Sequence, residues 1–123
     1  MKSMRLTSRL SLHLRHRTEC LGTIDAAGRF SIGRVDRALG PSLRFAAITA
    51  TKSRLVIRFL DIPDPPEGWV LVPVACPAGR YPHLRLTGPV IRSELRKVGL
   101  DYPVRVQFVA SLESRQVVMR RIR

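Results

Sequence analysis

Short runs rich in Val, Ile and Phe recur along almost the whole chain, and each is bounded by Gly, Pro, Asp or Ser. Runs of this length and composition are typical of β-strands. The pattern therefore predicts a mostly β fold, with strands at residues 10–16, 20–25, 29–32, 43–51, 54–60, 69–76, 83–88, 104–111 and 116–122.

Two other stretches, residues 34–39 and 90–98, carry apolar residues at helical spacing. Gly40 and Gly99 each follow the last apolar residue, which is the usual position of a left-handed C-terminal cap. Pro89 suits the first turn of the second helix, because a backbone N–H there has no intrahelical partner. We therefore expect two short helices among the strands.

Residues 61–69 contain three Pro and one Gly, so they can form neither a helix nor a central strand. We interpret this segment as a linker between a first unit at residues 1–60 and a second unit at residues 70–123. Each unit has the same order: a strand, a tight turn, a strand, a short basic helix, a Gly, and two strands joined by a polar turn. This order predicts an internal repeat with a period of about 59 residues, measured from Gly40 to Gly99.

The net charge is the compositional feature that bears most on function. The chain carries 22 Lys and Arg against nine Asp and Glu, a net charge of +13, and nineteen of the basic residues are Arg. Such a charge favours a polyanionic partner, nucleic acid first, with an acidic membrane surface or an acidic protein as the lesser options. Arg forms bidentate contacts with phosphate and with guanine edges that Lys does not form.

Residues 23–40, TIDAAGRFSIGRVDRALG, resemble the core of the AbrB-type DNA-binding proteins, the swapped-hairpin family. The shared order is an Asp, a Gly-Arg turn, a strand, a short basic helix and Leu-Gly. Asp25 and Arg29 also have the D-x-x-x-R spacing of the MraZ family, which carries two such units in one chain. The second unit is similar to the pattern in its helix and following strand, within residues 85–108.

The resemblance implies an AbrB-like swapped-hairpin β-barrel, closed by the two units within a monomer or together with a second copy in a homodimer. It also implies binding of double-stranded DNA in preference to RNA, as a small transcriptional regulator or DNA-organising protein that needs no cofactor. Arg-phosphate contacts would make the affinity steeply dependent on salt. The residues that would contact DNA are Arg29, Arg34 and Arg37 in the first unit and Arg85, Arg92, Arg96 and Lys97 in the second.

Two other functions fit the same composition. An RNA-binding or ribosome-associated β-barrel protein also uses many Arg, and binding to an RNA backbone needs no aromatic platform. The second alternative is an interaction module such as an antitoxin, which is weakened because two repeats leave no tail to wrap a toxin. An Arg on a short helix is also often only part of its solvated face.

The sequence contains no nucleophile elbow, P-loop or HExxH motif and no evident carboxylate pair, so we expect neither an enzyme nor a small-molecule substrate. The three His complete no metal spacing, and we interpret the distant Cys20 and Cys76 as buried thiols in a reducing cytoplasm. No run is apolar enough for a membrane span. We expect a cytoplasmic protein, nucleoid-associated in a bacterium, although residues 1–17 also have the composition of an organellar transit peptide.

Overall fold

The computed structural model describes residues 19–31, 45–75, 82–111 and 113–122. Along the chain they form β2 (Glu19–Ile24), β3 (Arg29–Ser31), β4 (Phe45–Thr51), β5 (Arg54–Leu60), β6 (Val70–Ala75), β7 (His83–Arg85), α3 (Pro89–Lys97), β8 (Val104–Ser111) and β9 (Gln116–Arg121). Each of these strands falls where the sequence pattern predicts one, with ends that differ by at most three residues. The predicted strand at 10–16 and the predicted helix at 34–39 lie outside the described residues.

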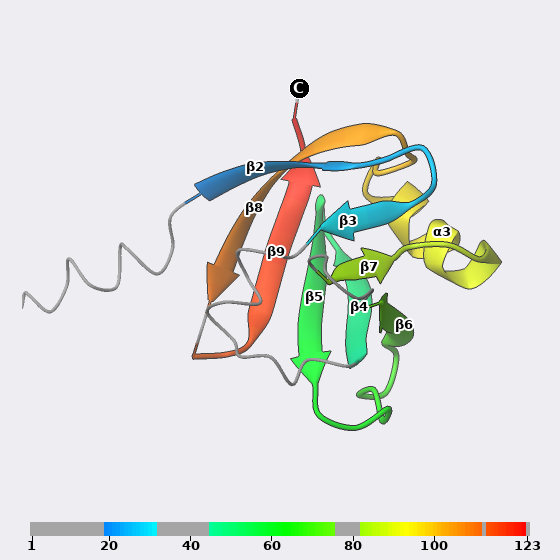
Figure 1. Cartoon of the computed structure of the whole chain (residues 1–123), viewed down its shortest axis with the longest axis vertical. Helices are drawn as coiled ribbons and strands as arrows, with labels where there is room; N and C mark the ends of the chain where they lie inside the picture. The colour runs from blue at the N-terminus through cyan, green and yellow to red at the C-terminus, as the bar shows by residue number, and fades with distance from the viewer. Residues whose placement is uncertain (1–18, 32–44, 76–81, 112, 123) are drawn as a thin grey trace, which may run out of the picture.

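The eight described strands close into one antiparallel barrel in the order β2-β3-β7-β6-β4-β5-β9-β8, and β8 pairs back to β2 (Figure 1). The prediction of a mostly β barrel is confirmed. Closure leaves no unpaired strand edge around the ring. An interior bounded by eight strands is narrow enough to be filled by side chains alone.

The core follows from the alternation of side chains along the strands. In β5, Leu55, Ile57 and Phe59 are buried, while the residues between them are partly exposed. Phe30 and Phe108 meet edge to face inside the barrel, with 5.3 Å between ring centroids. The polar and basic residues at the intervening positions are therefore left on the outer surface.

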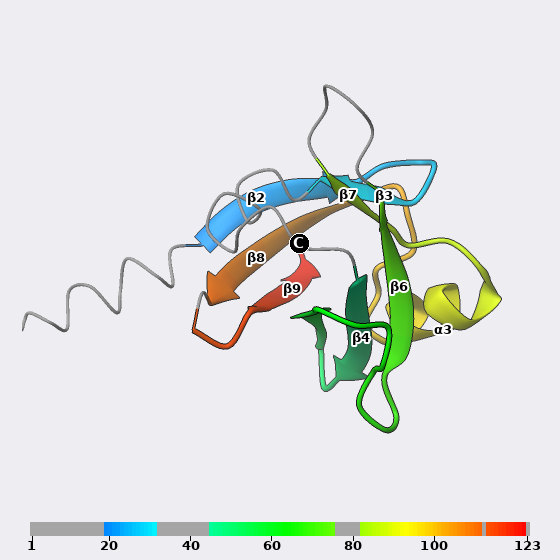
Figure 2. The ribbon, with the colours of Figure 1, turned by 60° about the horizontal axis from the view of Figure 1, so that its bottom comes forward.

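The two predicted units alternate around the ring. β2 of the first unit pairs with β8 of the second, and β6 of the second pairs with β4 of the first. The pairs β3–β7 and β5–β9 also join the two units, and they lie on opposite sides of the ring. In Figure 2, β3 and β7 lie above β9. The two units have corresponding strands: β2 corresponds to β6, β3 to β7, β4 to β8 and β5 to β9. Exchanging each strand with its counterpart leaves the order of strands around the ring unchanged. Both units therefore contribute to one core, and residues 61–69 connect β5 to β6.

The helix α3 begins at Pro89, one residue before the predicted start, and packs its buried Ile91 and Leu95 against β4 and β6. Gly99 follows it with φ +75°, and the N–H of the next residue donates to Leu95 O at 2.9 Å. This is the left-handed cap expected at that glycine. The residues that the structure describes hold one helix, so the expected count of two is not matched there.

Three smaller observations bear on the sequence predictions. No helix in the described part of the chain has the length and apolar character needed to cross a membrane. Cys20 packs against the core, and Cys76 lies outside the described residues. Within the described ranges, no three His, Cys, Asp or Glu side chains gather closely enough to hold a metal ion.

Candidate nucleic-acid interface

Asp25 holds the tight turn between β2 and β3. Its Oδ1 accepts hydrogen bonds from the backbone N–H groups of Ala27 at 3.0 Å and Arg29 at 2.9 Å. Its Oδ2 accepts a third from Arg29 Nε at 2.9 Å, which is also an ion pair. The backbone hydrogen bond from Arg29, aided by its guanidinium, lowers the pKa of Asp25 below its ordinary value. The charged carboxylate therefore fixes Arg29 at the first position of β3.

Gly28 joins this turn to the second unit. It has φ +80°, in the region that side chains other than Gly rarely adopt. A Cβ at this position would lie 2.9 Å from Thr87 Cγ2 and 3.0 Å from Tyr102 Cζ. The N–H of Leu86 donates to Gly28 O at 2.7 Å. The Gly-Arg turn of the first unit is thus docked on the segments that flank α3 in the second.

The outer surface of β3 and β7, formed by Arg29, Ser31, His83 and Arg85, is termed here the β3–β7 face. Arg29 lies directly opposite Arg85, and Ser31 lies opposite His83. Both arginines are exposed, and the residues between them along the strands face the core. Like charges directly opposite each other in a ladder are unfavourable. The carboxylate of Asp25 is paired with Arg29, whereas Arg85 has no acidic partner among the described residues.

His83 lies beside these two arginines on β7. Burial lowers its pKa below the ordinary value, and the charges of Arg29 and Arg85 lower it further. Its Nε2 is buried and has no hydrogen-bond partner within the described part of the protein. The imidazole is therefore neutral at pH 7 and leaves the positive charge of the face to the arginines.

The basic residues of α3 are partly neutralised within the protein. Arg92 Nη2 lies 2.9 Å from Asp101 Oδ1, and Arg96 Nε lies 3.6 Å from the other oxygen of the same carboxylate. Lys97 pairs with Glu94, whose Oε1 also accepts the N–H of Ala50 at 3.2 Å. The pKa of both carboxyls is lowered, chiefly by the hydrogen bonds from these cations. Three cations therefore leave a net charge of +1 on this part of the surface.

Tyr102 connects the turn to the helix. Its ring lies against the position of Gly28, and the Arg92 guanidinium carbon lies 4.7 Å from the ring centroid. This distance is within the range of a cation–π contact. Figures 1 and 2 both show the β2–β3 turn and α3 at the same end of the barrel. The turn, the β3–β7 face and α3 therefore form one continuous region of the surface.

The structure thus brings together five of the seven residues that the sequence analysis assigned to DNA contact: Arg29, Arg85, Arg92, Arg96 and Lys97. The remaining two, Arg34 and Arg37, lie outside the described residues. Arg29 and Arg85 form a cross-strand pair, while the three helix cations are tied to Asp101 and Glu94.

Sequence reasoning missed a second basic region. Arg54, Arg105, Arg120 and Arg121, termed here the β5–β9 cluster, come from β5, β8 and β9. All four are exposed. A signal for three of them was present, because Arg54 and Arg105 each directly precede a buried residue and Arg120 directly follows the buried Met119. The pattern predicted that the strands of Arg105 and Arg120 are joined by a polar turn, but it gave no means of knowing that β5 lies beside β9.

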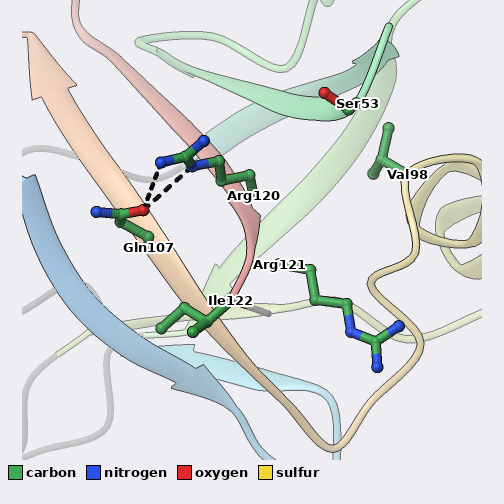
Figure 3. A pocket seen from close by; sticks show the side chains of 6 residues that line it. All are labelled: Ser53, Val98, Gln107, Arg120, Arg121 and Ile122. Carbon is green, nitrogen blue, oxygen red and sulfur yellow. Dashed lines mark hydrogen bonds between the residues drawn. The ribbon is translucent and has the colours of Figure 1, made fainter.

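A hollow of about 640 Å³ lies in this region, lined by Ser53, Val98, Gln107, Arg120, Arg121 and Ile122 (Figure 3). Arg120 donates to Gln107 Oε1 from Nε at 3.1 Å and from Nη2 at 2.8 Å. Arg121 extends from the other side of β9, toward the segment that follows α3 (Figure 3). A second hollow of about 360 Å³ shares Gln107 and Arg120 and adds Arg54. No described residue that lines either hollow is acidic.

No protein-family model, curated protein or solved structure matches this chain.

Proposed function

We propose that this protein binds double-stranded DNA through the β3–β7 face and the adjoining surface of α3. The observation that carries the proposal is the placement of Arg29 directly opposite Arg85, since the two come from different units and lie 56 residues apart in sequence. Two guanidinium groups side by side on an exposed surface repel each other in the free protein. A phosphate group bound between them would accept a charge-assisted hydrogen bond from each guanidinium and offset their repulsion.

The strand order supports a swapped-hairpin barrel of the AbrB or MraZ type. In such a fold each unit completes the sheet of the other, and here β2 pairs with β8 while β6 pairs with β4. The Asp25 turn, with its Gly28 and Arg29, has the geometry needed to present the Gly-Arg dipeptide at the surface. The related placement of the two units within one chain favours a monomer that acts as a pseudo-dimer.

Contacts to the nucleic-acid backbone explain the surface better than stacking on bases. Two aromatic side chains at the surface, Trp69 and Tyr102, are covered by Arg58 at 4.8 Å and Arg92 at 4.7 Å. Neither belongs to the β3–β7 face. Affinity would therefore come chiefly from phosphates, which suits a small transcriptional regulator or DNA-organising protein of the cytoplasm.

The test compares the affinity for a random-sequence DNA duplex with the affinity for an RNA hairpin of equal charge, each across a salt series. We expect tighter binding of the DNA duplex and a steep decline of its affinity with salt. Preference for the hairpin would favour the RNA-binding alternative. Absence of binding to either at low salt would leave the basic surface to a protein partner and contradict the proposal.

A further inference from the structure

Arg54 and Arg120 of the β5–β9 cluster lie on β5 and β9, on the side of the barrel away from the β3–β7 face. In the ring, β3 is four strands from β5, and β7 is four strands from β9, which is the largest separation that eight strands allow. A straight duplex held on the β3–β7 face therefore does not reach Arg54 and Arg120. The proposed DNA contact leaves these two arginines without a role.

The cluster is also less neutralised than α3. Arg120 is held by the neutral amide of Gln107, which orients the guanidinium without cancelling its charge. Arg54 lines the same hollow as Arg120, at the next position of a ladder in which Leu55 pairs with Met119. None of the five described ion pairs involves an arginine of the cluster. Three arginines of the cluster, Arg54, Arg120 and Arg121, line hollows in which no described residue is acidic, and such a surface suits the phosphates of a nucleic-acid backbone.

We propose that Arg54 and Arg120 of the β5–β9 cluster form a second phosphate-backbone contact, so that one protein molecule holds two DNA segments on opposite sides of its barrel. This inference rests on the proposed function and specifies it, because a protein that joins two duplexes organises DNA. The exchange of the two units maps β3 onto β7 and β5 onto β9, so each of these pairs is carried onto itself, and the two pairs lie on opposite sides of the ring. Both pairs carry closely placed arginines on their outer surface.

The experiment measures capture of a fluorescent DNA duplex by a second duplex fixed to beads, with and without the full-length protein. The wild type is expected to capture the fluorescent duplex and, in excess short duplex, to bind two duplexes per protein. Arg54→Gln combined with Arg120→Gln is expected to lower capture at least about tenfold, because charge-assisted contacts to phosphate are lost. This variant still binds one duplex at the β3–β7 face.

The matched control is Arg58→Gln combined with Arg115→Gln, which removes the same charge. Arg58 is held by Gln116 and Trp69, and Arg115 is paired with Asp61, so neither belongs to the cluster. We expect this control to capture nearly as much duplex as the wild type. Circular dichroism of each variant confirms that the barrel is folded.

The outcomes separate the two proposals. One duplex per wild-type protein and no capture would overturn the second contact while leaving the proposed function intact. Capture that persists in the Arg54→Gln/Arg120→Gln variant would also overturn it, as would capture explained by dimers of the protein alone in sedimentation. If no duplex binds at all, the proposed function itself fails.

Discussion

Replacement of Gly28 by Ala tests how firmly the first unit is docked on the second. The new methyl group would lie 2.9 Å from Thr87 Cγ2 and 3.0 Å from Tyr102 Cζ, in a backbone conformation with φ +80°. The left-handed conformation costs about 1–2 kcal/mol for a residue with a Cβ. Overpacking at a well-packed contact adds about 1–3 kcal/mol. We therefore expect a loss of about 2–5 kcal/mol in the free energy of unfolding.

The chain supplies a matched control at Gly68, which has φ +85° and no atom within 4 Å of a built Cβ. Gly68→Ala should show only the conformational part, about 1–2 kcal/mol. Both variants are measured by urea unfolding followed by circular dichroism. Adding Thr87→Ser removes the methyl group that the new Cβ would meet, and should restore part of the stability lost in Gly28→Ala.

The difference between the two glycine variants is the informative quantity. If Gly28→Ala and Gly68→Ala cost the same within a few tenths of a kcal/mol, the uncertainty typical of such comparisons, the turn is not packed against Thr87 and Tyr102. The inference that the turn, the β3–β7 face and α3 form one continuous surface would then be wrong.

Three further predictions concern charges around the interface. The pKa of Asp25 is lowered in the folded protein, so the charged carboxylate stabilises the fold above its unfolded pKa, and this contribution is lost as the pH falls below about 4. Between neutral pH and that range, the urea midpoint of Asp25→Asn should therefore fall less than the midpoint of the wild type. A bound phosphate should raise the lowered pKa of His83, and an NMR titration with and without duplex in which that pKa does not move would contradict the placement of DNA on this face. Asp101→Asn frees Arg92 and Arg96, so we expect duplex affinity to rise by up to about fivefold in fluorescence anisotropy, while an unchanged affinity would remove α3 from the interface.

The strands were predictable because the local signal is strong. In β8 the sequence VRVQFVAS places Val106 and Phe108 on the core side and Arg105 and Gln107 outside. Alternation of this kind shows which side of a strand is buried but not which strand lies beside it. The pairing of β2 with β8 joins residues 80 to 90 positions apart in the sequence, and it depends on closure of the whole barrel.

The candidate site was predictable only in part, for the same reason. Arg29 and Arg85 were each identified from the sequence, but their direct opposition depends on the register of β3 with β7. The neutralisation of Arg92 by Asp101 was missed because the two residues meet across the turn after α3, nine positions apart. The arginines of the β5–β9 cluster resemble ordinary solvated strand positions until β5, β8 and β9 are placed together.

The central claim is that Arg29 and Arg85 together hold a DNA phosphate backbone. The most direct measurement is the slope of the logarithm of duplex affinity against the logarithm of salt concentration, for the wild type and for Arg29→Ala/Arg85→Ala. Loss of two phosphate contacts should reduce the magnitude of the slope by about two, with about 0.9 for each contact, and lower the affinity at every salt concentration. An unchanged slope, or a loss no greater than that of Arg58→Gln/Arg115→Gln, would contradict the assignment.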